Sequence, residues 1–245
     1  MSRICVSISP NFGGRSVLGS GSIWTPALLS GKLLWVDDST LGGDISGGVV
    51  ASWTDKSGAG HPLTQATGSK KPAGSLTGGP NGLGYVETDG VDDFLRVTFT
   101  LAQPSFVFLV TKKITSAQNN PRFMDGASAN SMDLFTAGAA PGSNTTLSLS
   151  AAAGTFTSNS ATLTDWNRLE LQLNGASSKI KIGDGSYATG TVNSSSPGGI
   201  IIGCWGDQSS APIQARYNTV IVCSTIPSAA ELSELHNWAK NRTGV

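Results

Sequence analysis

Acidic residues are scarce, and their spacing limits the chemistry that the chain could perform. A glycoside hydrolase needs two carboxyl groups beside the scissile bond, about 5 to 9.5 Å apart. The sequence has four glutamates, Glu87, Glu170, Glu231 and Glu234. Glu170 is the glutamate at the centre of an expected strand, and its same-face neighbours Arg168 and Gln172 are not acids. This pattern predicts that the chain is not an enzyme.

Nucleophilic catalysis by serine or cysteine would need a histidine within reach, and the chain has two, His61 and His236. Neither lies in a nucleophile motif, so both are interpreted as structural. The cysteines are Cys5, Cys204 and Cys223, which form no metal-binding pair. Cys204 and Cys223 fall on expected late strands that could be neighbours; buried, reduced thiols are favoured over a disulfide.

A calcium site is a second hypothesis. Asp89, Asp92 and Asp93 lie within five residues, and oxygen-rich turns bind calcium. The alternative is that Asp89 opens a tight turn with Gly90 and that Asp92 accepts hydrogen bonds from the backbone of that turn. The expectation is therefore no required cofactor, with calcium at these aspartates as the alternative.

The tryptophans indicate where a ligand or partner would bind. Four lie in patterns that predict core packing, namely Trp35, Trp53, Trp166 and Trp238. Trp24 and Trp205 do not, and Trp205 follows a strand and precedes Asp207 and Gln208. The segment Trp205, Asp207 and Gln208 is predicted to be a ligand or contact loop.

Composition excludes several classes of protein. Lys and Arg number 16 and so do Asp and Glu, so no basic stripe for nucleic acid is expected. The apolar runs are far shorter than the roughly 20 residues of a membrane-spanning helix. The first residues lack the apolar core of a signal peptide, so synthesis in a reducing cytoplasm is expected. With 31 glycines and 13% charged residues, the chain is typical of turn-rich sheet proteins.

The sequence predicts that these residues lie on short strands separated by turns rich in Gly, Asn and Ser. Residues 94–101 alternate strictly, with Leu95 and Val97 expected in the core and Arg96 on the other face. Residues 106–110 are continuously apolar, which predicts a central strand covered on both sides. Further strands are expected at 32–36, 49–53, 85–88, 168–173, 179–182, 200–204 and 219–223. The spacing favours an all-β sandwich of antiparallel sheets.

The two ends of the chain differ from this pattern. Residues 1–29 are interpreted as an arm for attachment or oligomerisation, and residues 30–245 as the domain. The arm's apolar residues, which could add an edge strand to a neighbouring subunit, are Ile4, Val6, Ile8 and Phe12. At the other end, Ser228 and Glu231 form a capping box ahead of an apolar stripe that includes Leu235 and Trp238. A short C-terminal helix is expected to dock on the sheet edge or the end of the sandwich.

Five motifs in order resemble one known family. They are residues 53–58, 89–95, Trp166 before an alternating strand, 201–203, and the final strand with 228–231. From Gly31 to Arg242 the chain resembles the concanavalin A-like lectin and glucanase (laminin-G-like) jelly rolls, especially those of bacteriophage virion proteins. The resemblance implies two antiparallel sheets of about six or seven strands each and, in some members, a calcium ion at the rim.

The functional expectation rests on this resemblance and on the missing acid pair. It is a non-catalytic bacteriophage virion structural protein, a capsid decoration or head-fibre subunit that docks through its arm and forms a homo-oligomer. The alternative is a tail-associated or cell-surface carbohydrate-binding (adhesion) module. The expected partners are virion shell or tail proteins and, for the alternative, a host glycan, with assembly in the host cytoplasm. The fold does not decide between these, because it hosts lectins and glycosidases alike.

Overall fold

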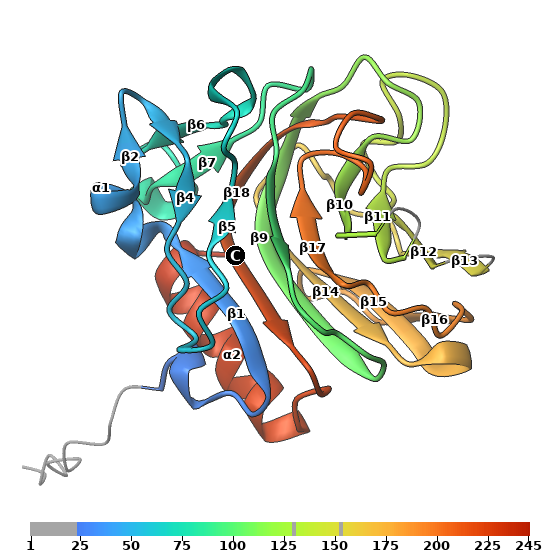
Figure 1. Cartoon of the computed structure of the whole chain (residues 1–245). Coiled ribbons are helices and arrows are strands. Elements are labelled where there is room, and N and C mark those ends of the chain that lie inside the picture. Colours follow the sequence, from blue (N-terminus) through green and yellow to red (C-terminus); the bar gives the residue numbers. More distant parts are fainter. Residues whose placement is uncertain (1–23, 129–130, 152–153) are drawn as a thin grey trace, which may run out of the picture.

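A computed structural model describes residues 24–128, 131–151 and 154–245, which form two packed antiparallel sheets (Figure 1). The expected all-β sandwich is confirmed. The sheets are larger than the resemblance implied, with ten strands in sheet A and eight in sheet B.

Sheet A runs in the spatial order β16 (Ala188–Gly190), β15 (Ser178–Ile182), β14 (Asn167–Leu173), β9 (Ser105–Thr115), β18 (Gln214–Cys223), β7 (Tyr85–Glu87), β6 (Ala73–Ser75), β3 (Val49–Val50) and β2 (Ile45–Ser46), with β1 (Lys32–Asp37) also paired to β18. Sheet B runs β13 (Gly154–Thr157), β12 (Ser148–Ala151), β11 (Asp133–Phe135), β10 (Arg122–Gly126), β17 (Gly199–Ile202), β8 (Leu95–Thr98), β5 (Leu63–Thr64) and β4 (Ser52–Trp53). The helices are α1 (Leu41–Asp44), α2 (Ala229–Thr243) and five 3-10 turns, η1 (Pro26–Leu28), η2 (Asp38–Thr40), η3 (Gly68–Lys70), η4 (Pro80–Gly82) and η5 (Gly175–Ser177).

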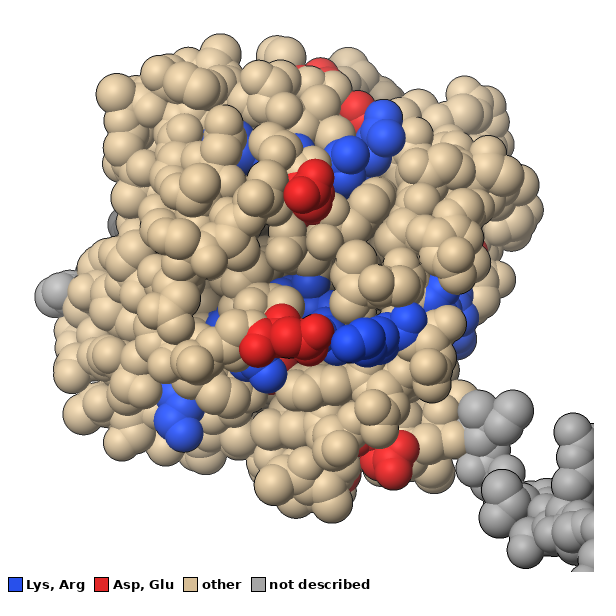
Figure 2. Space-filling model, turned by 180° about the vertical axis from the view of Figure 1, so that it is seen from behind, with Lys and Arg blue, Asp and Glu red and all other residues tan. Residues whose placement is uncertain are grey.

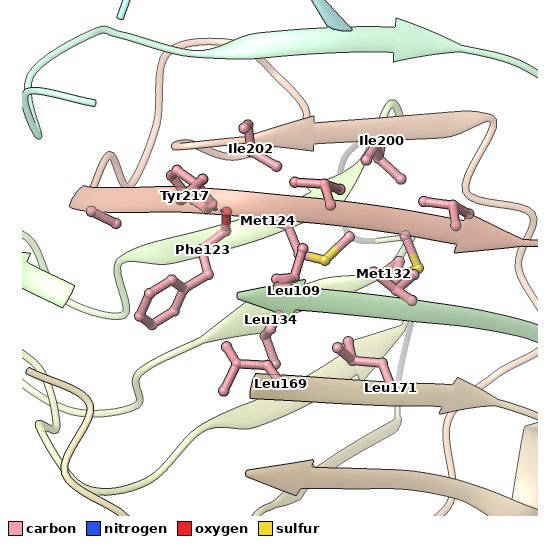
Figure 3. Close-up of a cluster of buried hydrophobic side chains, with 14 of the residues drawn as sticks. Leu109, Phe123, Met124, Met132, Leu134, Leu169, Leu171, Ile200, Ile202 and Tyr217 are labelled. Carbon is pink, nitrogen blue, oxygen red and sulfur yellow. Dashed lines mark hydrogen bonds between the residues drawn. The ribbon is translucent and has the colours of Figure 1, made fainter. Parts of the chain in front are cut away.

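The main core lies between the sheets (Figure 3). Leu169 of β14 points into this core from sheet A, and Met124 and Leu134 reach it from sheet B. The Tyr217 hydroxyl donates a hydrogen bond of 2.8 Å to the Phe123 carbonyl oxygen, so the polar end of this buried ring is satisfied. Burial of this apolar surface is the main force that holds the two sheets together.

Strand β9 is covered on both sides, as its apolar sequence predicted. Val107 and Leu109 pack into the inter-sheet core. Phe106 and Phe108 point outward, into a second cluster that includes Leu235 of α2. Successive residues of a strand face opposite sides, so only a strand covered on both sides is apolar throughout.

The sequence did not predict strands β10 to β13. In β10 a register shift lies between Arg122 and Met124, and Phe123 and Met124 both enter the core. The bulge removes the alternation by which a strand is identified in a sequence. The next strands are only three or four residues long, too short for a periodic pattern.

Helix α2 begins with the predicted capping box. The Ser228 hydroxyl accepts from the Glu231 amide at 3.2 Å, and the Glu231 carboxylate accepts from the Ser228 amide at 2.8 Å. The predicted docking site was wrong, because α2 packs on the outer face of the central strands β9 and β18 rather than on an edge. Leu235 and Ala239 are fully buried there. The apolar outer side of those strands explains this position.

The segment that precedes β1 packs beside α2, where Trp24 and Leu29 contact the outer cluster of sheet A. Ile4, Val6, Ile8 and Phe12 lie outside the described residues, so the role of the arm stays a prediction. Among the described residues, none of the helices has the length and apolar character needed to cross a membrane.

Candidate functional site

A row of outward-facing residues crosses sheet B. Strand pairing aligns Thr64 with Arg96, Arg96 with Ile201, and Ile201 with Asp125. Met124 pairs with Leu134, so the next residues along each strand, Asp125 and Asp133, also lie opposite each other. Since Met124 and Leu134 point into the core, these two aspartates point outward. Two acidic side chains therefore meet on neighbouring strands near the middle of the sheet.

Asp125 is held in place by backbone donors. Its Oδ1 accepts from the amides of Gly126 at 2.6 Å and Met132 at 3.1 Å, and its Oδ2 accepts from the Gly206 amide at 3.0 Å. Hydrogen bonds from N–H groups stabilise the charged form of a carboxyl group. Asp125 therefore connects three segments, those that contain β10, β11 and the loop after β17, as a carboxylate.

Asp133 lies in a different environment from its partner. Burial and the negative charge of Asp125 together raise the pKa of Asp133 to about 7, although Arg122 opposes both effects. The Arg122 guanidinium lies 3.5 Å from the Asp133 carboxylate, and Oδ1 of Asp133 has no hydrogen-bond partner among the described residues. Burial and the neighbouring negative charge thus favour the protonated form of Asp133, the form in which a general acid acts.

Aromatic rings surround the cation that covers this pair. The Arg122 guanidinium carbon lies 4.5 Å from the centre of the Phe135 ring and 4.9 Å from that of Trp205. Both rings are half-buried, so each keeps some exposed surface. Apolar ring surface next to charged groups is suited to the C–H face and hydroxyl groups of a sugar.

The predicted contact loop lies beside the acid pair. Trp205 faces Arg122, and the Gly206 amide binds Asp125. Asp207 closes the loop by accepting from the amides of Ser209 and Ser210, and these bonds outweigh burial and lower its pKa. Asp207 is therefore a turn residue, whereas its neighbour Gln208 lines a surface hollow.

That hollow, of about 510 Å³, lies on the same face of sheet B. Arg96, Phe94 and Thr64 line it from the sheet or its border, and Gln65 and His61 line it from the segment around β5. Arg96 belongs to the row that contains Asp125, with Ile201 between them. With strand spacings of about 4.8 Å, the backbones of Arg96 and Asp125 lie roughly 10 Å apart. About two sugar units could span this distance.

Glu170 occupies the outer face of sheet A, under the C-terminal part of α2. Its Oε1 lies 2.6 Å from Nε2 of His236, and its Oε2 accepts from the Tyr187 hydroxyl at 2.6 Å. Burial alone would raise the pKa of Glu170, but the hydrogen bonds from His236 and Tyr187 and the charge of Lys181 outweigh it and lower the pKa. The same contact with Glu170, together with burial, raises the pKa of the Tyr187 hydroxyl.

These contacts make Glu170 and His236 a pair that joins α2 to sheet A, which is consistent with a structural histidine. Arg168, next to Glu170 on the same face, pairs with Asp184. Figure 2 shows the side of the molecule that is hidden in Figure 1, where most of the surface is uncharged and acidic and basic side chains lie next to one another.

The three predicted metal ligands come together. Carboxylate oxygens of Asp89, Asp92 and Asp93 all lie within 4.8 Å of one another. Local donors already use several of them: Asp89 Oδ1 accepts from the amides of Val91, Asp92 and Asp93. Burial and the charges of Asp89 and Asp92 raise the pKa of Asp93 to about 7. The turn forms, but Asp89 rather than Asp92 accepts its backbone hydrogen bonds. The calcium hypothesis stays a prediction.

Cys204 and Cys223 cannot pair with each other in this fold. Cys204 follows β17 and lies in a cluster on the outer side of sheet B with Phe94 and Ile201. Cys223 lies on the outer side of sheet A. Both are free and buried, and burial raises the pKa of each thiol to about 12, which makes them unreactive. The free thiols agree with the favoured interpretation.

Asp125, Asp133 and Arg122 were not predicted as site residues. A carboxyl pair was expected along one strand, whereas this pair forms across β10 and β11, two strands that the sequence did not predict. A usable signal is present: Arg122, Asp125 and Asp133 lie within twelve residues of a chain in which only 13% of residues are charged.

Comparison with known proteins gives a fold but not a family. No family model and no curated protein matches the chain. Among solved structures, the sialidase of Trypanosoma rangeli in complex with sialic acid superposes with a TM-score of 0.59 at 12% identity, over 98% of this chain and 36% of that one. An arabinofuranosidase complexed with arabinofuranosyl-alpha-1,2-xylobiose superposes with a TM-score of 0.53 at 16% identity, over 77% of this chain and 50% of that one. This chain thus spans about a third and a half of their lengths.

These neighbours support the sheet sandwich and give no support to a bacteriophage family. They contradict the prediction of a non-catalytic virion structural protein and the prediction that the chain is not an enzyme, because both neighbours are glycosidases. The prediction considered acids along one strand only, whereas the fold brings Asp125 and Asp133 together from neighbouring strands.

Proposed function

We propose that the chain is a carbohydrate-active protein that binds a glycan on the outer face of sheet B and hydrolyses a glycosidic bond with Asp133 as proton donor. The observation that carries this proposal is the buried Asp125–Asp133 pair, in which the pKa of Asp133 is raised to about 7. A carboxyl group kept protonated beside an ionised one is a common arrangement of acid catalysts. The glycosidases that share the sandwich add support.

Asp133 and Asp125 would act as one acid unit. Asp125 contributes a hydrogen bond and a negative charge to Asp133, so the two groups are in contact. Two separate catalytic carboxyl groups would need a gap of about 5 Å or more between them. In the proposed reaction Asp133 gives its proton to the leaving oxygen, the glycosidic bond breaks, and water adds to the anomeric carbon. The proton that the water loses returns to the pair.

Access to Asp133 depends on the side chain that covers it. Asp133 is 1% exposed, and Arg122 lies against its carboxyl group. Phe135 and Trp205 hold the guanidinium between them, and the same two rings are the surfaces on which a sugar would stack. A bound sugar would therefore compete with Arg122 for these rings and would move it away from Asp133.

The test is an assay of the purified full chain on aryl glycosides and polysaccharides, in which hydrolysis is measured as the release of reducing ends. Asp133→Asn should lower the rate at least 100-fold, the usual contribution of a general acid. Glu170→Gln is the matched control, since it removes a buried carboxylate from the other sheet; its rate per folded molecule should stay within about threefold. The proposal fails if no substrate is cleaved or if Asp133→Asn retains the wild-type rate.

The pH profile is a second readout. Activity needs protonated Asp133, so it should fall as the pH rises through about 7. A rate that instead increases from pH 6 to pH 8 would mean that Asp133 is not the acid.

A further inference from the structure

The hollow beside Arg96 has the chemistry of an anion site. None of the residues that line it is acidic, and Arg96 is its cation. Arg96 donates from one amino group to the Ala127 carbonyl oxygen at 2.8 Å, and its Nε is buried without a hydrogen-bond partner. Within the described ranges, Arg96 forms no ion pair with an acidic side chain. A half-buried guanidinium with neither a counter-ion nor a full set of acceptors favours an anionic ligand.

Gln65 is an independent observation that points to the same ligand. It is 6% exposed and lines the hollow. Its Oε1 accepts from the Thr67 amide at 2.9 Å, which fixes the orientation of the side-chain amide, and its Nε2 has no hydrogen-bond partner among the described residues. A buried amide donor without a partner costs free energy unless an acceptor reaches it. Gln65 and Arg96 thus both line the hollow, and each has a nitrogen without an acceptor among the described residues.

The other walls suit the ring of a sugar rather than a bare ion. Phe94 and Val97 add apolar surface, while Thr67 and Gln208 add polar groups at the margin. The volume of about 510 Å³ lies within the usual range for small-molecule sites, about 300 to 1,000 Å³. A ring with both apolar faces and hydroxyl groups matches this mixture.

We infer that the hollow binds the carboxylate-bearing sugar of an acidic glycan, with Arg96 and Gln65 as the carboxylate-recognising residues. This inference deepens the proposed function, because the hollow and the acid pair lie in one row on the same sheet face. Three strand spacings, about 14 Å, separate Arg96 on β8 from Asp133 on β11, so a glycan that spans both would present an acidic sugar to Arg96 and a glycosidic bond further along the glycan to Asp133.

The test is calorimetric titration of the full chain with D-galacturonate, D-galactose and D-galactose 6-sulfate. Galacturonate should bind at least tenfold more tightly than galactose. Arg96→Gln should abolish this preference, whereas Lys179→Gln, which removes one positive charge from sheet A, should retain it. Gln65→Glu keeps the acceptor for the Thr67 amide but adds a negative charge, so it should abolish the binding of galacturonate and leave the melting temperature close to that of the wild type.

Equal binding of the acidic and neutral sugars would overturn the inference, as would a galacturonate preference that survives in Arg96→Gln. Equally tight binding of the sulfated sugar would overturn the carboxylate assignment. The same titrations with Asp133→Asn separate this inference from hydrolysis, because that variant should retain the preference for galacturonate. Binding without turnover by the wild type would then count against the proposed function alone, and turnover of neutral glycans alone would count against this inference.

Discussion

On sheet A, Glu170 is buried among His236, Tyr187 and Lys181, whereas on sheet B Asp133 is buried beside another carboxyl group. The two carboxyl groups are equally inaccessible, at 1% exposure each. Their pKa values nevertheless move in opposite directions, because Glu170 is surrounded by donors and cations while Asp125 repels the charge of Asp133. Burial alone therefore does not identify a functional acid; the charges around it do.

The same contrast extends to the covering elements. Helix α2 covers the outer face of sheet A with a packed apolar cluster, and its His236 reaches Glu170. The outer face of sheet B instead carries a hollow and a loop around Trp205. We expect the outer face of sheet A, packed against α2, to serve stability and the outer face of sheet B, around the hollow, to serve binding. The predictions below test this division.

The largest effect on stability is expected at the contact between α2 and sheet A. Leu235 is fully buried against Phe106 and Phe108, so Leu235→Ala should lower the free energy of unfolding by about 2 to 5 kcal/mol. Chemical denaturation measures this change. An unchanged denaturation midpoint would show that α2 does not unfold cooperatively with the sheets. The packing of α2 would then not distinguish the outer face of sheet A from that of sheet B.

Replacement of Glu170 and of Asp133 by the corresponding amides should change the stability of the protein in opposite directions. Glu170→Gln removes the partner of His236 and Lys181 and should destabilise the protein by about 2 to 4 kcal/mol at pH 8. The stability supplied by Glu170 is present above its unfolded pKa of 4.5 and is lost as the pH falls through its lowered native pKa. The difference between this variant and the wild type should thus shrink in acid.

Asp133→Asn should stabilise the protein at pH 8 by about 1 to 3 kcal/mol, given about 1.4 kcal/mol per pKa unit. The unfolded pKa is 3.8 and the native value is about 7, so the native state holds a proton that the unfolded chain has lost. Wild-type stability should therefore fall as the pH rises between these values, and the variant should lose part of this slope. Asp93 adds a slope of the same sign, so Asp93→Asn is the control. Destabilisation by Asp133→Asn at pH 8 would contradict the charge repulsion on which the comparison depends.

Some features of the two outer faces could be predicted from the sequence, and others could not. The apolar run at 106–110 and the capping box at Ser228 have short-range patterns, so both were identified. The position of α2 depends on which strands become central, which is a property of the whole sheet. Asp125 and Asp133 are separated by a turn, and their contact depends on the register of two strands, one of which is bulged. Local periodicity contains no information on such a pairing.

The residues predicted as a site show the same limit. The sequence placed Trp205, Asp207 and Gln208 in one loop, and in the structure that loop lies between the acid pair and the hollow. Its role in binding stays a prediction. Arg96 was assigned to the outward face of its strand, but no local pattern could show that Gln65 would lie beside it across a sheet.

The smallest effect is expected at the aspartate cluster that precedes β8. Three backbone amides already donate to Asp89 Oδ1, and the Asp89 amide donates to Asp93 Oδ2 at 3.2 Å. A calcium ion would have to share these oxygens with the turn, although it would also relieve the repulsion that raises the pKa of Asp93. We therefore expect 1 mM calcium or a chelator to change the melting temperature at pH 8 by less than about 1 °C, since a ligand stabilises only in proportion to its occupancy. A larger increase that disappears in Asp92→Ala would instead show that the ion binds here, and that this end of sheet B, like Glu170 on sheet A, neutralises its carboxylates with a cation.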